Sequence, residues 1–122
     1  MSDKPRITQA DLQQFTGTEQ WYRHGLNRAV LFTDGAKYVA DTCGAYWLLD
    51  EIALAQRYTK SLAVEEFQVW TLTVHPDRTA ALVCDDGNGR KLLSKEIPFT
   101  DFPMETVTLW CSNNTILLPS EY

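Results

Sequence analysis

The most regular pattern of apolar positions lies over residues 45–56 and predicts an α-helix. At 100° per residue, one face of this helix collects five apolar side chains: Ala45, Leu48, Leu49, Ile52 and Ala55. Trp47 and Leu54 fall together on the opposite face, where Asp50 and Glu51 flank them. A helix with apolar side chains on two sides lies between two layers of the protein or presents one side to a partner.

Two shorter helices are expected before this one. Thr8 stands three residues before Asp11, an arrangement typical of a helix start, and opens a helix over 9–15 that Gly17 ends. A second helix is predicted over 36–43, where apolar residues recur at helical spacing. The pair Asp34-Gly35 is expected to form a turn before this second helix, and Gly44 ends it.

Strand-like patterns occur in both halves of the chain and dominate the second. Aromatic and β-branched residues predict two short early strands over 21–24 and 29–33, and five later ones over 67–75, 79–84, 90–97, 105–111 and 115–118. The later runs are separated by turn signals, of which Asn113 and Asn114 tolerate the positive φ of a tight turn.

This order of elements predicts an α+β fold. We expect an antiparallel sheet of about five or more strands, with an early helical pair packed on one face. The length of 122 residues fits a single domain over 1–122, with a flexible start at 1–7.

Charge and hydropathy exclude several classes of function. The net charge is -5 and basic residues form no cluster along the chain, so we expect no direct binding of nucleic acid. The N-terminus lacks the apolar stretch of a secretion signal, and no run of eighteen apolar residues occurs. We therefore expect a cytoplasmic protein without a membrane segment.

The cysteines and histidines predict no metal or cofactor. The three cysteines are far apart and form no C-x-x-C pair, which fits neither a disulfide framework nor a zinc site. Cys84 and Cys111 end predicted strands and are interpreted as core residues. His24 and His75 are too far apart for the one-turn spacing of a helical metal site, and the acidic, glycine-bearing segment 85–89 is interpreted as a hairpin loop.

One enzymatic alternative remains open on the sequence. A small hydrolase or transferase would gather His24, Asp34 and Cys43, or the early carboxylates, in a cleft beside the sheet, with Cys43 as the candidate nucleophile. Cys43 lies at the C-terminal end of a predicted helix, which is the wrong end to stabilise a thiolate.

Three segments carry a resemblance to a known family. Phe15–Glu19, Thr33–Tyr38 and Gly44–Ile52 together resemble small bacterial proteins of unknown function, and the similarity is clearest over 15–56. That family occurs in bacterial genomes, plasmids and prophages. The resemblance implies no catalytic residues, but its setting suggests a mobile-element factor that inhibits a host defence complex of the CRISPR or restriction type.

These patterns favour a non-enzymatic protein-binding factor. Trp47 and Leu54 would supply apolar contacts to a protein partner, with Asp50 and Glu51 as polar contacts beside them. Two alternatives stay open for the same stripe. Internal packing would cover it with Trp70, Trp110 or the N-terminal segment, and a symmetric homodimer would bury it against a second copy.

Overall fold

The computed structural model describes residues 7–122, which form an α+β fold. The expected flexible start lies, apart from Ile7, outside the described residues, and Ile7 is buried. The helices are α1 (Gln9–Gln13), α2 (Asp34–Cys43), α3 (Tyr46–Tyr58), α4 (Lys60–Ala63) and the 3-10 turn η1 (Pro119–Glu121). The strands are β1 (Trp21–Arg23), β2 (Leu31–Thr33), β3 (Phe67–Val74), β4 (Ala80–Asp85), β5 (Lys91–Ile97), β6 (Thr106–Ser112) and β7 (Thr115–Leu117).

The seven strands form one sheet in the order β1-β2-β7-β6-β3-β4-β5. All neighbours run antiparallel except β2 and β7, so the expectation of a wholly antiparallel sheet is wrong at that pair. The chain reaches β7 from β2 only after three helices and four strands, and periodicity within a strand contains no information on such a distant partner. The tight β6–β7 turn is confirmed, because Asn113 and Asn114 both have positive φ.

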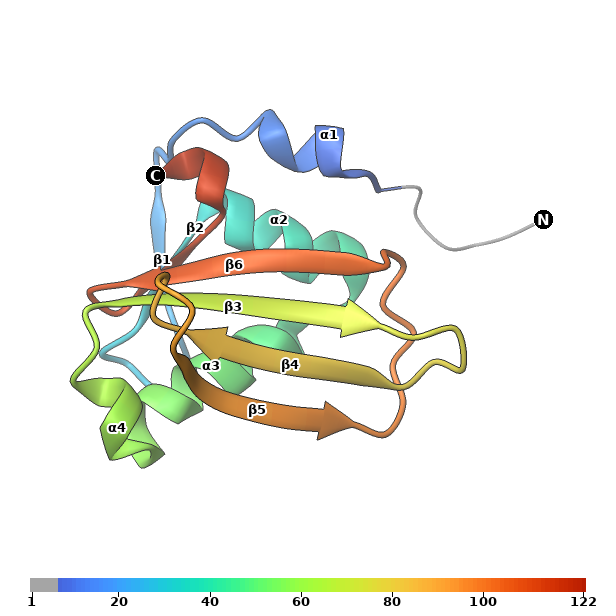
Figure 1. Cartoon of the computed structure of the whole chain (residues 1–122). Coiled ribbons are helices and arrows are strands. Elements are labelled where there is room, and N and C mark those ends of the chain that lie inside the picture. Colours follow the sequence, from blue (N-terminus) through green and yellow to red (C-terminus); the bar gives the residue numbers. More distant parts are fainter. Residues whose placement is uncertain (1–6) are drawn as a thin grey trace.

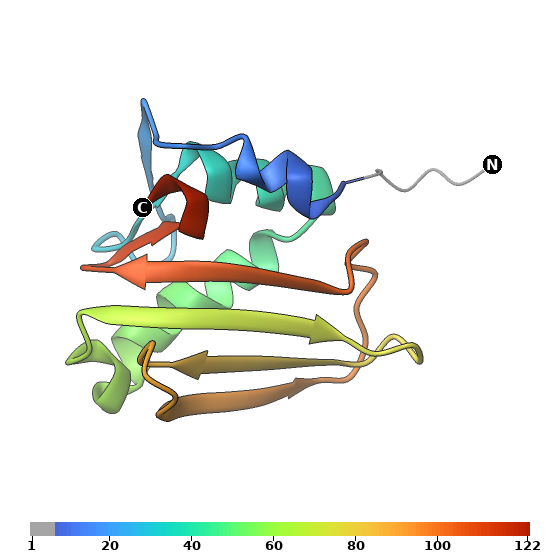
Figure 2. The ribbon, with the colours of Figure 1, turned by 45° about the horizontal axis from the view of Figure 1, so that its top comes forward.

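Helices α2 and α3 lie behind the sheet in Figure 1, and Figure 2 shows the same side of the sheet from a tilted view. In both views no described helix lies in front of β3, β4 and β5. The core lies between the sheet and these helices, where large apolar side chains are fully buried: Leu48, Leu49, Ile52, Trp70, Leu72, Leu82 and Leu109. The predicted helical pair is thus present on one side of the sheet.

Helix ends follow local capping chemistry. At α1 the predicted helix start is confirmed, since the Thr8 side chain accepts from the Asp11 amide and the Asp11 carboxylate accepts from the Thr8 amide. Gly44 ends α2 in the left-handed conformation, with φ 61°. The predicted turn at Asp34-Gly35 is wrong: these residues form the first turn of α2, because the Thr33 hydroxyl accepts from the Ala36 amide at 3.2 Å.

The predicted helix over 45–56 is confirmed as α3, which runs two residues further to Tyr58. The short helix α4 was not predicted, because its four residues are too few to show a period.

Candidate functional site

The second apolar stripe of α3 borders an open groove. Trp47, Glu51, Leu54 and Tyr58 follow one another at spacings of four, three and four residues, so they lie along one side of the helix. Trp47 and Leu54 are half-buried, whereas the other apolar face of α3 is in the core. The stripe is therefore neither fully covered nor fully exposed.

The groove runs between α3 and strand β5. One part is lined by Trp47, Ile97 and Phe99, and the adjoining part by Leu54, Tyr58 and Leu93. Glu51 and Lys95 line both parts. The Lys95 ammonium lies 2.7 Å from the Glu51 carboxylate, so this ion pair crosses the groove between its two apolar halves.

Strand β5 is the last strand of the sheet on this side. It pairs only with β4 in the described sheet, so its outer edge offers backbone donors and acceptors along the groove. Natural edge strands often carry exposed lysines, which prevent unwanted pairing with other strands, and Lys91 and Lys95 are such residues on β5. The outer edge of β5 can therefore pair with another strand, but its lysine charges restrict which chains can pair with it.

Large aromatic side chains are exposed at both ends of the groove. Phe99 is 69% exposed next to the Trp47 half, and Tyr58 is 73% exposed next to the Leu54 half. Trp70 and Trp110 do not cover the stripe, because Trp70 is buried in the core and Trp110 faces the other side of the sheet. Internal packing thus accounts for the stripe only in part.

Asp50 lies beside this stripe, three residues after Trp47, and contacts His24. His24 Nε2 lies 2.8 Å from an Asp50 carboxylate oxygen, and His24 Nδ1 accepts the backbone N–H groups of Leu26 and Asn27 at 3.1 Å each. This pattern assigns the ring proton to Nε2. His24 is buried and fixes the loop between β1 and β2 to α3, which is a structural role.

The residues of the enzymatic alternative are not gathered in one place. Asp34 begins α2 and Cys43 ends it, about 14 Å apart at 1.5 Å per residue, and His24 contacts Asp50 rather than either of them. A hydrogen bond from the Glu19 backbone lowers the pKa of Asp34, and the Tyr22 hydroxyl also donates to it. Burial raises the pKa of Cys43 to about 11, which opposes thiolate formation.

The other cysteines lie in the core, and the described acids form no metal cluster. Cys84 and Cys111 are buried in strands, which confirms their interpretation as core residues. Over residues 7–122, no three side chains of His, Cys, Asp or Glu converge as metal ligands would. The described helices also include none with the length and apolar character that a membrane crossing requires.

A buried amide network behind the groove was missed by sequence reasoning. Gln56 and Gln68 exchange two side-chain hydrogen bonds of 2.7 and 2.8 Å, and Gln68 also accepts from Trp70 Nε1 and donates to the Leu62 carbonyl. The network joins α3, α4 and β3. Gln56 lies at the end of the apolar face of α3. A polar residue on this core-facing side was the signal in the sequence for a buried hydrogen-bond network.

The comparisons with known proteins give a family but no activity. A family model matches residues 6–122. The chain belongs to the DUF6876 family, a family of unknown function. The match covers the sheet-forming half as well as the early segments that carry the resemblance noted from the sequence. Neither a curated protein nor a solved structure matches the chain.

Proposed function

We propose that this protein binds another protein through the groove between α3 and β5, with Trp47 and Leu54 as its main apolar contacts. One observation carries the proposal: both side chains are half-buried on a helix face that borders an open groove beside an unpaired strand edge. A partner that fills the groove would remove the remaining apolar surface from water, at about 25 cal/mol for each Å².

An extended partner segment suits this shape best. It would pair its backbone with the outer edge of β5 and alternate its side chains toward and away from the groove. Leu93 and Ile97 lie in the two halves, four residues apart along β5 or about 14 Å. Two apolar side chains at the same spacing in the partner would occupy both halves, on either side of the Lys95 and Glu51 pair.

Polar contacts would come from Glu51 in the middle of the groove and from Asp50 at its margin. Glu51 is already paired with Lys95. A carboxylate of the partner can take the place of Glu51 beside Lys95, and a basic group can take the place of Lys95 beside Glu51. Asp50 accepts from His24, so it would contact a partner only with its free oxygen.

The identity of the partner is proposed from the setting that the family resemblance implies. We propose that the protein acts in the bacterial cytoplasm as a mobile-element inhibitor of a host defence complex of the CRISPR or restriction type. Inhibition would be steric and electrostatic: Trp47 would fill an apolar pocket of the partner, while Asp50 and Glu51 would meet basic groups on it. A cell with an active defence system would then admit phage or plasmid DNA more efficiently when it expresses this protein.

The test of the groove uses a photo-reactive phenylalanine analogue at position 99 in the native host. Position 99 is exposed at the groove, and position 21, where Trp21 is 57% exposed on β1 at the opposite edge of the sheet, is the matched control. We expect the analogue at position 99 to cross-link to a partner protein, and the analogue at position 21 not to do so. Leu54→Ser should abolish the cross-link from position 99. Plating efficiency of phage or plasmid, with and without the same variant, tests the inhibitory role.

The possible results separate the alternatives. Equal cross-linking from positions 99 and 21 would contradict a partner in the groove. A cross-link between two copies of this chain would assign the groove to a homodimer. Light scattering checks that result, since it measures the mass of the free protein.

A further inference from the structure

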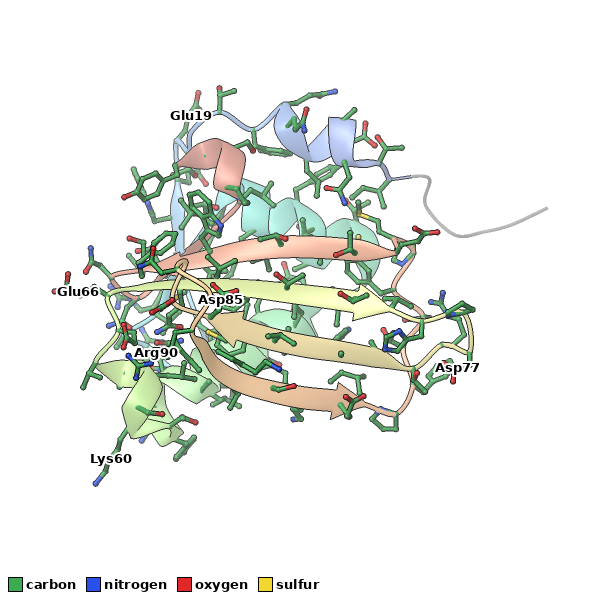
Figure 3. All side chains as sticks on the ribbon, in the orientation of Figure 1. Glu19, Lys60, Glu66, Asp77, Asp85 and Arg90 are labelled. Carbon is green, nitrogen blue, oxygen red and sulfur yellow. The ribbon has the colours of Figure 1, made fainter. Side chains whose placement is uncertain are left out.

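On strands β3–β6 the outward face of the sheet carries two carboxylates and one cation, and strand register places a further cation, Arg23, on the same side only at the far edge, on β1. Strand register puts the following residues on this face, which we call the open sheet face: Phe67, Val69, Thr71, Thr73, Ala81, Val83, Asp85, Lys91, Ser94, Glu96, Thr106, Thr108, Trp110 and Ser112. Asp85 and Glu96 are its acids, and its one cation, Lys91, is opposite Asp85 beyond a bulge at the start of β5. Figure 3 looks onto this face and shows Asp85 on the viewer's side, at the end of β4.

The loops around the open sheet face add further acids. Glu66 precedes β3, Asp77 lies in the turn between β3 and β4, and Glu105 precedes β6. Figure 3 shows Glu66 and Asp77 at opposite ends of the sheet. Two arginines lie in the same loops: Arg78 donates to two carbonyls of the β5–β6 loop at 3.0 and 2.8 Å and keeps its positive charge, whereas Arg90 lies 3.5 Å from Glu65, so these two charges offset each other.

Three aromatic rings pack together at the end of this face near Asp85. The Phe67, Trp110 and Tyr122 rings have centroids 5.0 to 6.1 Å apart and interplanar angles of 71 to 74°. Tyr122 is 77% exposed, so part of the cluster faces solvent. Exposed faces of tryptophan and tyrosine rings attract guanidinium and ammonium groups.

The sign of the net charge decides what can cover this face. A second copy of the chain would bring one acidic face against another, and a nucleic acid would bring phosphates, so both would be repelled. We propose that the open sheet face binds a protein segment rich in arginine and lysine. This second surface is distinct from the groove between α3 and β5 and does not depend on it.

The face also sets the spacing of the cationic groups. Glu96 is opposite Ala81, and Asp85 lies four residues further along β4, so the two carboxylates are about 14 Å apart. Trp110 lies two strands from Asp85 in the same row, at about 10 Å. An extended segment with basic residues at positions i and i+4 matches the carboxylates, and an adjacent arginine reaches the aromatic cluster.

The probe for this proposal is a peptide of nine arginines, with a peptide of nine citrullines as the uncharged control of the same shape. Binding is followed by NMR on the intact protein, through the Trp110 indole signal and the backbone amides of Thr71 and Val83. We expect the arginine peptide to shift these signals and the citrulline peptide to leave them unchanged.

Paired variants separate this face from the net charge of the protein. Asp85→Asn with Glu96→Gln removes two charges from the face, and the new side-chain amide oxygen at position 85 can still accept from the Gly87 amide, as Asp85 does at 2.7 Å. Glu19→Gln with Asp101→Asn removes two charges from exposed loops. At about 0.1 M salt we expect the first pair to weaken binding about tenfold and the second less than about twofold.

The cation and the aromatic cluster of the face have their own variants. Lys91→Gln removes the positive charge opposite Asp85 and should strengthen binding of the arginine peptide about twofold. Trp110→Leu should weaken the same binding about threefold to tenfold.

Several results would overturn the proposal. One is that the two double variants, Asp85→Asn with Glu96→Gln and Glu19→Gln with Asp101→Asn, weaken peptide binding equally. The others are NMR signal shifts centred on α3 and β5, and an arginine peptide that does not bind. A dimer in light scattering that Val83→Lys dissociates would assign the face to a second copy and overturn it too.

Discussion

One face of α3 packs into a core whose polar groups are paired, whereas the face with Trp47 and Leu54 borders an open groove. On the core side, every buried side-chain nitrogen and oxygen in residues 7–122 has a hydrogen-bond partner, and Gln56 is tied to Gln68. On the groove side, Trp47 and Leu54 remain partly exposed to water, and the ion pair of Glu51 with Lys95 across the groove is partly exposed too.

The contrast teaches where this helix is fixed and where it is available. Buried hydrogen bonds define one arrangement of α3 against the sheet, since any other arrangement would leave donors or acceptors unpaired. The groove side has no such constraint, so a partner can add contacts there without breaking the fold. The following changes test both sides of the comparison, in order of decreasing expected effect.

Gln68→Leu should have the largest effect, because it removes the centre of the buried network. The Gln56 amide, the Trp70 N–H and the Leu62 carbonyl would all lose a partner in the core. We expect the free energy of unfolding to fall by about 3–5 kcal/mol. Urea unfolding measures it, with Gln13→Leu on exposed α1 as the control. A loss below about 1 kcal/mol would show that the network contributes little net stability.

Gly35→Ala should be the next most destabilising change. The carboxylate of Glu121 accepts from the Thr33 hydroxyl, the Gly35 amide and the Leu118 amide, and so holds η1 against the start of α2. A methyl group at position 35 would collide with this carboxylate and lie 2.7 Å from Leu118 Cδ1. We expect a loss of about 2–3 kcal/mol in thermal or urea unfolding.

Gly17→Ala is the matched control for that change, since an added methyl group there meets no atom within 4 Å. If both variants were equally stable, the packing of η1 on α2 would not be a determinant of the fold.

Stability should fall in alkaline solution because of the buried thiols. Burial raises the pKa of Cys43 to about 11 and those of Cys84 and Cys111 to about 12, from an ordinary value of 9.0. Between pH 9 and the raised pKa of each folded thiol, only the unfolded chain releases the thiol proton. The free energy of unfolding that is present below pH 9 is therefore lost as the pH rises toward 12. The slope is at most about 1.4 kcal/mol per pH unit for each thiol.

Urea unfolding in reductant at pH 8, 9 and 10 measures this slope, and Cys43→Ala should make it shallower. Thiolate absorbance that rises near pH 9 in the folded protein would contradict the prediction, because it would show thiols that ionise as they do in the unfolded chain.

Elements with a local signal were predictable from the sequence, and partners across the fold were not. The period of α3, the start of α1 at Thr8 and the Asn113-Asn114 turn follow from neighbouring residues and are confirmed. The parallel pairing of β2 with β7 depends on residues more than eighty positions apart, which no local pattern records.

The candidate site shows the same division. The sequence predicts the stripe of Trp47 and Leu54, because a helical period fixes which residues share a side. It does not predict that Lys95, Ile97 and Phe99 face that stripe, since the position of β5 opposite α3 is set by the whole sheet. His24 and Asp50, too, are brought together by the fold alone.

The smallest effect is expected from the ion pair that crosses the groove. Lys95→Met and Glu51→Gln, alone and together, form a double-mutant cycle in which we expect a coupling energy of about 0.2–1 kcal/mol, because both side chains are partly exposed. Since water and salt screen such a pair, raising the salt from about 0.05 to 1 M should reduce the coupling further.

A coupling above about 2 kcal/mol that salt does not reduce would show that the pair stays formed and separates the two halves of the groove. The two halves would then be separate pockets, and an extended segment lying along β5 could not fill both. A weak, screened pair instead leaves one continuous groove, because a bound chain can displace Lys95 at little energetic cost.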